Sequence, residues 1–211
     1  MKELRTAGHQ VLGLVRSDAA ADRLAGLGVE AHRGDLSETD SLVAGARACD
    51  GVIHTAYIHD WSNATFEAAA EIDRRTVEAM AAAMEGSGKS FVIASGTALL
   101  PPGRIGTEED PAVTEGLGAH RGRTEASMQA AAGRGVRAGV VRLPPSVHGA
   151  GDHGFLPALI DIARRKGISA SPATARIAGR PCTGWTPRAS FGWRSRTALP
   201  ERACMPSPKK A

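Results

Sequence analysis

The chain has 211 residues and a mass of 21.9 kDa, with 42% hydrophobic and 23% charged residues, the composition of an ordinary globular domain. No apolar run approaches the roughly 18 residues of a membrane helix, and the opening "MKELRTAGHQ" lacks the apolar stretch of a signal peptide. We therefore expect a cytoplasmic protein with no membrane partner. Three widely spaced cysteines, Cys49, Cys182 and Cys204, fit neither a disulfide framework nor a zinc motif.

The formal net charge of +4 is unevenly distributed. Residues 171–211 hold 8 Lys and Arg against 1 Asp and Glu, whereas residues 1–170 hold 18 against 21. Because the basic charge lies in the last fifth of the chain, the body does not predict a nucleic-acid partner.

Short apolar runs alternate with helical segments through residues 1–170. Strands are expected at 10–15, 29–36, 51–56, 90–95 and 136–143, and helices at 19–28, 37–48, about 63–84, 123–133 and 155–167. Ser17 or Asp18 is the expected cap of the first of these helices and Gly28 its stop, and Ser37 with Asp40 resembles a capping box for the second. This alternation predicts a doubly wound α/β domain with a parallel sheet covered on both faces.

Residues 171–211 differ from the body, since they lack a sustained strand or helix period and carry half of the 12 prolines. One interpretation is a disordered basic tail. The other is a frameshift in the coding DNA. Read in another frame, Thr174 to Arg196 can encode "DGANRWPAVHWLDAARLLRLALE", which contains an amphipathic helix. We therefore divide the chain into a partial nucleotide-binding domain, 1–170, and a tail or frameshifted remnant, 171–211.

Five segments occur in a characteristic order: "AGHQVLGLVRS", "RGDL", "GVIHTA", "FVIASGTA" and "VVRLPPSVHGAGDHGF". Over about residues 3–167 the chain resembles the extended short-chain dehydrogenase/reductase family, also called the NAD-dependent epimerase/dehydratase family. The resemblance implies a Rossmann-like sheet that here lacks the first strand and its glycine-rich loop. That strand is central in the order 3-2-1-4-5-6, so its two neighbours would each lose a backbone partner. The implied activity is hydride transfer at a carbinol or carbonyl carbon.

The resemblance also implies a set of cofactor-binding residues. Arg16, followed by Ser17, stands where an acid favours NAD, and a cation there can meet a 2′-phosphate, so NADP(H) is favoured over NAD(H). Asp35 corresponds to an adenine-contacting acid and Leu36 to an apolar wall for the base. The alternatives are an exposed arginine beside a helix cap and an aspartate that caps a turn. Five further residues would line the cofactor: His54, Thr55, Ala56, Pro144 and Pro145.

Catalysis in this family uses a Ser or Thr hydroxyl together with a Tyr and a Lys four residues later. Ser95 and Thr97 are the hydroxyl candidates, although both could simply cap the end of a strand. The expected Tyr and Lys are absent, because "HRGRTEASM" offers Arg121 and Glu125 at that spacing, and the only tyrosine, Tyr57, lies elsewhere. We include His120 and Arg121 as candidate catalytic residues.

Two glycine-rich segments imitate nucleotide-binding motifs. "GAGDHG" at 149–154 fits G-x-G-x-x-G but does not directly follow an expected strand, and "GSGKS" at 86–90 precedes one. We interpret both as turns. The histidine pairs His54/His59 and His148/His153 lack the further ligands of a metal site, so no metal is expected.

Three hypotheses therefore follow for function. The chain is an NAD(P)-dependent oxidoreductase, a non-catalytic NAD(P)-sensing protein, or an inactive truncated gene product. The expected partners are a small carbonyl or alcohol substrate and a second copy in a homodimer, with no nucleic acid and no membrane.

Overall fold

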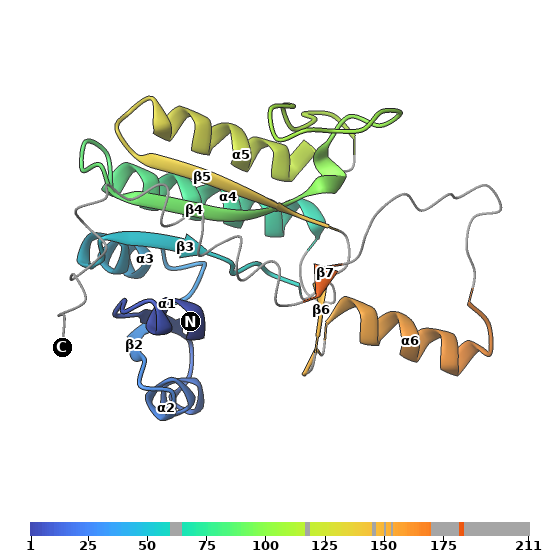
Figure 1. Cartoon of the computed structure of the whole chain (residues 1–211), viewed down its shortest axis with the longest axis horizontal. Helices are drawn as coiled ribbons and strands as arrows, with labels where there is room; N and C mark the ends of the chain where they lie inside the picture. Colours follow the sequence, from blue (N-terminus) through green and yellow to red (C-terminus); the bar gives the residue numbers. More distant parts are fainter. Residues whose placement is uncertain are drawn as a thin grey trace, which may run out of the picture.

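The computed structural model describes residues 1–59, 65–116, 119–144, 147–149, 151–152, 154–169 and 182–183. Its main strands form two parallel sheets (Figure 1). In the two-strand sheet, β1 (Leu12–Val15) pairs with β2 (Glu30–Arg33). In the three-strand sheet, β4 (Ser90–Gly96) lies between β3 (Gly51–His54) and β5 (Arg137–Leu143). The predicted doubly wound α/β fold is confirmed, and the sheet is interrupted between β1 and β3.

The two-strand sheet has a small core of its own. Helix α2 (Asp18–Gly26) follows β1 and begins at Ser17, whose hydroxyl oxygen accepts a hydrogen bond from the Ala20 N–H. The chain turns out of α2 at Gly28, where φ is +62°, a backbone conformation that favours glycine. The predicted cap and stop are thus confirmed. Val15, Leu24 and Val29 are the buried residues of this core.

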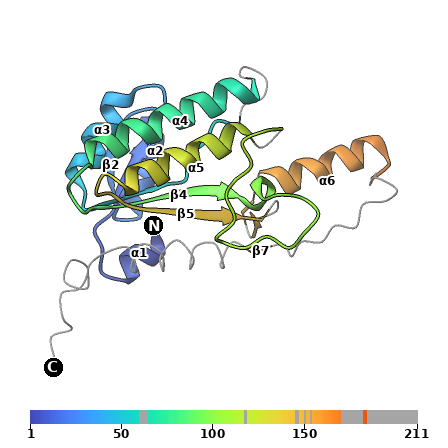
Figure 2. The ribbon, with the colours of Figure 1, turned by 90° about the horizontal axis from the view of Figure 1, so that it is seen from above.

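Helices flank the two sheets, and one of these helices connects them. Short α1 (Lys2–Thr6) precedes β1, and its Arg5 guanidinium donates to the carbonyl of Leu27, the residue that ends α2. Helix α3 (Thr39–Ala48) connects β2 to β3 and packs on α4 (Phe66–Ala83), which packs on α5 (Ala119–Ala132). Figure 2 shows α4 and α5 over the same face of β4 and β5.

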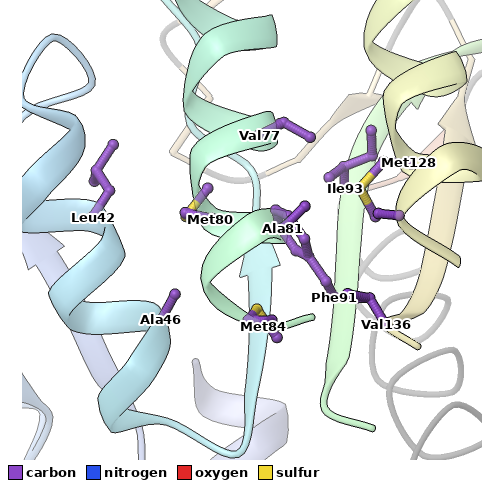
Figure 3. Packing of buried hydrophobic residues seen from close by; sticks show 11 residues of the cluster. Leu42, Ala46, Val77, Met80, Ala81, Met84, Phe91, Ile93, Met128 and Val136 are labelled. Carbon is purple, nitrogen blue, oxygen red and sulfur yellow. The ribbon is translucent and has the colours of Figure 1, made fainter. Parts of the chain in front are cut away.

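The main core lies between α3, α4 and α5 and the three-strand sheet. Phe91 on β4 is 0% exposed and lies beside Met84 and Val136 (Figure 3). The other buried residues of this cluster are Leu42, Ala46, Val77, Met80, Ala81, Ile93, Met128 and Ala131. This packing explains why the three-strand sheet is the better-buried part of the fold.

The predicted capping box at the start of α3 is wrong. The N-cap is Glu38, and its side chain makes no capping hydrogen bond. Ser37 lies one residue before this N-cap, and its hydroxyl donates to the Asp35 carboxylate at 2.7 Å. The backbone N–H of Ser37 bonds the same oxygen at 2.9 Å.

The remaining described elements are a short turn, two short strands and one helix. The 3₁₀ turn η1 (Thr97–Leu99) follows β4, and two-residue strands β6 (Val147–His148) and β7 (Cys182–Thr183) pair in parallel. Helix α6 (Phe155–Lys166) extends from the body (Figure 1), with Leu159, Ile160 and Ile162 exposed. Within the described ranges, no helix is both long and apolar enough to cross a membrane.

Candidate functional site

The carboxyl ends of β1 and β2 bring two predicted cofactor residues together. Arg16 follows β1, and its guanidinium lies 3.6 Å from the Asp35 carboxylate beyond β2. The Arg16 side chain is 80% exposed. The pKa of Asp35 is lowered, chiefly by the hydrogen bonds from Ser37 and further by the Arg16 charge. An exposed cation therefore stands beside an ionised carboxylate at the edge of the sheet where doubly wound folds bind nucleotides.

Two neighbouring residues predicted to bind the cofactor, Ser17 and Leu36, differ in exposure. Ser17 is exposed at the N-cap of α2, beside Arg16. Leu36 is half-buried and packs against the main hydrophobic cluster, and its carbonyl accepts a hydrogen bond from the Thr76 hydroxyl at 3.0 Å. Leu36 therefore joins the two sheets, and its role as a wall for an adenine base stays a prediction.

The end of β3 is held by a buried polar pair. The His54 ring, 8% exposed, has its Nε2 2.9 Å from a carboxylate oxygen of Asp73 on α4, which is 2% exposed. The other Asp73 oxygen accepts from the Thr124 hydroxyl on α5 at 3.3 Å. Thr55 and Ala56 follow in exposed positions. The His54 side chain is thus buried against α4, whereas the two residues that follow it lie at the surface.

Tyr57 lies beside Arg121, although the two are far apart in the sequence. The Arg121 guanidinium carbon lies 4.2 Å from the centre of the Tyr57 ring, within the range of a cation–π contact. The Nη2 of Arg121 donates to the Ala94 carbonyl on β4 at 2.7 Å. The pKa of Tyr57 is raised because burial outweighs the lowering effect of the Arg121 charge. Arg121 therefore links the end of β3 to the end of β4.

The end of β4 carries a second buried polar cluster. The Ser95 hydroxyl, on β4, donates to Glu125 Oε1 on α5 at 2.5 Å. Arg142 on β5 donates from Nη2 to Glu125 Oε2 at 2.6 Å, with Nε 3.2 and 3.1 Å from the two oxygens. Ser95 and Glu125 are 8% and 3% exposed. The hydrogen bonds to Glu125 raise the pKa of Arg142.

The same arginine fixes the loop between η1 and α5. Arg142 Nη1 donates to the Asp110 carbonyl at 2.7 Å, and Arg104 pairs with the Asp110 carboxylate. That pairing, with the Thr107 N–H, holds the pKa of Asp110 well below its usual range. A Cβ at Gly122 would clash with the Val113 carbonyl, so α5 admits this loop only because it has a glycine there.

The other predicted catalytic residues are not all together. The Thr97 hydroxyl, half-buried on η1, lies 3.4 Å from the Leu143 carbonyl. His120 instead lines a groove between α4 and α5 with Glu67, Ala70, Glu71, Arg74 and Arg123. Pro144 is half-buried after β5, and Pro145 lies outside the described residues. The structure thus brings Arg121 and Ser95 to one edge through Ala94, whereas no hydrogen bond joins His120 to them within the described part.

The two glycine-rich segments contain turns in the residues that the structure describes. "GAGDHG" separates β6 from α6, so a short strand does precede it, contrary to the expectation. Gly154 is the N-cap of α6, and its N–H donates to the Asp152 carboxylate at 2.8 Å. A carboxylate of the chain itself therefore lies at this helix N-terminus, where a nucleotide loop would bind a phosphate. "GSGKS" forms the turn before β4, with the Ser87 hydroxyl donating to the Met84 carbonyl. In the described ranges, three or more potential metal ligands do not gather anywhere.

The sequence pointed to several of these polar residues but not to the residues that they contact. It placed Glu125 at the spacing of the family lysine but did not find Arg142, which follows "VV" as an arginine inside an apolar strand. A charge in such a strand predicts a buried partner, and this signal was available. Nothing in the sequence pairs Tyr57 with Arg121 or His54 with Asp73, because those contacts depend on the packing of α4 and α5 on the sheet.

Comparison with known proteins agrees with this geometry. Residues 1–138 match the model of a family described as NAD(P)H-binding. An uncharacterized protein of Schizosaccharomyces pombe is 41% identical over 175 residues, which are 81% of this chain and 57% of the relative. A 4-hydroxy-2-methyl-3-oxo-4-farnesyl-3,4-dihydroquinoline-1-oxide ketoreductase of Stigmatella aurantiaca is 32% identical, over 79% of this chain and 51% of the relative. The chain thus spans about half the length of these curated relatives.

The fold is also found in solved structures. UDP-N-acetylglucosamine 4-epimerase from Bacillus cereus superposes with a TM-score of 0.66 at 12% identity, covering 93% of this chain and 68% of that enzyme. At this identity the likeness concerns the fold alone. Together with the motif series and the family match, it confirms the resemblance that the sequence indicated. The chain belongs to the NAD(P)H-binding family and has the Rossmann-like fold of the short-chain dehydrogenases/reductases and NAD-dependent epimerases.

Proposed function

We propose that the chain is an NAD(P)-dependent oxidoreductase that interconverts a small alcohol and its carbonyl compound. The observation that carries the proposal is the placement of charged and polar side chains at the carboxyl ends of the strands. An exposed cation and a carboxylate end the two-strand sheet at Arg16 and Asp35, and Ser95 ends the three-strand sheet beside Arg121 and Glu125. A dinucleotide is long enough to need both ends of such an edge.

The residues present fit the adenosine half of the cofactor. Arg16 has spare N–H donors, is mostly exposed and is only loosely paired with Asp35, as a site for a 2′-phosphate requires. Asp35 remains ionised, with its position fixed by Ser37. These features favour NADP(H) over NAD(H). When bound, the cofactor supplies or accepts a hydride at its nicotinamide.

Arg121 is the residue we propose to face the substrate oxygen. It occupies the place of the family tyrosine and is held by the Ala94 carbonyl and the Tyr57 ring. An arginine stays charged at all ordinary pH values, so its role is to stabilise negative charge on the oxygen and not to give up a proton. Thr97, on η1, is the second hydroxyl candidate beside the site.

A second function, binding without turnover, is favoured by one specific observation. The position of the family lysine holds Glu125, whose two oxygens are taken up by Ser95 and Arg142. A protein that senses the NAD(P)H level needs the nucleotide site alone, and the polar cluster would then be structural.

Titration of the purified chain with NADPH, followed by cofactor fluorescence, tests the proposal. We expect saturable binding that weakens about tenfold or more in Arg16→Ala, because a charge-assisted pair is lost, and no comparable change in the exposed control Arg23→Ala. A panel of small carbonyl compounds then measures NADPH oxidation by absorbance. Binding with turnover supports the oxidoreductase and binding without turnover the sensor. The absence of NADPH binding would contradict both.

A further inference from the structure

The buried hydrogen bond between Ser95 and Glu125 has a chemical consequence for the reacting end of the site. The hydroxyl donates to the carboxylate, and a hydrogen bond to an ionised acceptor is stronger than one between neutral groups. Since Ser95 has a single proton and gives it to Glu125, its remaining lone pairs can only accept. Ser95 therefore presents an acceptor, and the group it meets must be a donor such as an alcohol.

The residues around this pair favour a negative charge on Glu125. Arg142 contacts both oxygens of Glu125, and the carboxylate is 3% exposed, so water does not compete for it. Glu125 thus has one cation on one side and one hydroxyl on the other. The other buried carboxylate nearby, Asp73, is bound to His54 and Thr124 and makes no direct bond to Ser95 or Glu125 among the residues the structure describes.

Tyrosine cannot act as the proton carrier at the usual place in this chain, because Arg121 stands there. Arg121 cannot replace it, since a guanidinium does not release its proton at ordinary pH. The carboxylate that the Ser95 hydroxyl contacts is Glu125, and carboxylates serve as proton acceptors in general acid–base chemistry.

We propose that Ser95 and Glu125 form a two-step proton relay, with Glu125 as the terminal acid and base of the reaction. This inference rests on the proposed function. In alcohol oxidation the substrate O–H bond breaks and its proton moves to Ser95 Oγ, while the Ser95 proton moves to Glu125 Oε1. The hydride leaves the same carbon for the oxidised nicotinamide cofactor, so a carbonyl product and a neutral Glu125 carboxyl result. Carbonyl reduction returns the proton along the same two oxygens.

The test compares the Ser95–Glu125 pair with a second Ser–Glu pair, between α5 and α4, that serves as a matched control. The Ser127 hydroxyl on α5 donates to Glu78 Oε1 on α4 at 2.7 Å, so Ser127→Ala and Glu78→Gln control for loss of a Ser–Glu bond. Glu125→Gln keeps an acceptor for Ser95 but cannot take up a proton. Ser95→Ala leaves the Glu125–Arg142 pair intact and therefore tests the relay if the glutamine variant does not fold, and Ser95→Thr keeps the hydroxyl.

Each variant is measured for NADPH binding, for turnover of an alcohol and carbonyl panel, and for a hydroxyl proton resonance protected from exchange. We expect wild-type binding in all of them and at least a hundredfold loss of turnover in Glu125→Gln and Ser95→Ala. Both controls should keep turnover within a few-fold of wild type, and Ser95→Thr should recover part of the turnover that Ser95→Ala loses. The protected resonance should vanish in Ser95→Ala and shift in Glu125→Gln.

Turnover retained in Glu125→Gln would overturn the relay. So would a wild-type chain that binds NADPH, shows the protected resonance and turns over no substrate, and that result would leave cofactor binding intact. Failure of the wild-type chain to bind NADPH would instead remove the proposed function on which the relay rests. The two failures are therefore distinguished by the binding titration.

Discussion

The three-strand sheet and the two-strand sheet differ in how completely they are packed. β4 has seven residues and a strand on each side, and it contributes Phe91 and Ile93 to a core cluster of eleven buried residues. β1 and β2 have four residues each, and only three buried residues form their core. Leu14, on β1, is 40% exposed. Stability is thus concentrated in one region, whereas the exposed cation of the proposed nucleotide site lies in the other.

This difference has a functional meaning. Segments with few buried contacts open at lower free energy than the core, so we expect the Arg16–Asp35 end of the site to be the more dynamic one. The Ser95–Glu125 end is anchored in the packed region. A nucleotide that contacts both ends would connect a rigid part of the fold with a less stable part.

The largest expected effect is on the three-strand sheet. Phe91→Ala removes a ring that is 0% exposed, and we expect it to lower the free energy of unfolding by about 3–5 kcal/mol. Denaturant unfolding measures this value. Because the cluster includes residues of α3, α4 and α5, the whole fold should be destabilised. A loss below about 1 kcal/mol would show that this cluster is not the principal core.

Leu24→Ala should have a smaller and more local effect. Leu24 is 8% exposed in the small cluster, so we expect about 2 kcal/mol, the low end for Leu→Ala, since the surface nearby can relax. Amide hydrogen exchange should show loss of protection in β1, α2 and β2 with β4 nearly unchanged. Equal loss of protection in both sheets would mean that they unfold as one unit, which would contradict the expected difference in stability between them.

Thr76→Val tests the link between the sheets. The Thr76 hydroxyl, on α4, donates to the Leu36 carbonyl beyond β2 at 3.0 Å, and Thr76 is 0% exposed. Removing the donor leaves that carbonyl unpaired, so we expect about 1 kcal/mol of destabilisation. Hydrogen exchange should show the loss near β2 first, and Thr6→Val, on exposed α1, should have no such effect.

Asp35 should make the two-strand sheet sensitive to acid. Its pKa in the folded chain lies below its ordinary value of 3.8, so its contribution is present above that pH and disappears as the pH falls through the folded value. The effect should stay under about 1 kcal/mol because the pair is partly exposed. The stability difference between wild type and Asp35→Asn should therefore shrink below about pH 4. A difference that is constant down to pH 2 would exclude this linkage.

The sequence predicted the elements well because each depends on local signals. Apolar runs identified the five main strands, and Ser17 and Gly28 marked the ends of α2 as the structure has them. The Ser37 capping box was wrong because the N-cap is the next residue, Glu38, and Ser37 belongs to the turn at Asp35. Glu125 was noted for its spacing from Arg121, but its contacts were not predicted, since its partners Ser95 and Arg142 come from β4 and β5. Contacts of that kind are decided by tertiary packing and not by local pattern.

The most direct test of the account is amide hydrogen exchange of the purified chain with and without saturating NADPH. If the nucleotide spans both sheets, protection should rise at residues 12–17 and 33–36 and also at 94–97. The gain should be larger at the first two segments because they are the less stable part. Protection confined to one sheet, or no change at concentrations that saturate cofactor fluorescence, would contradict a single site along this edge.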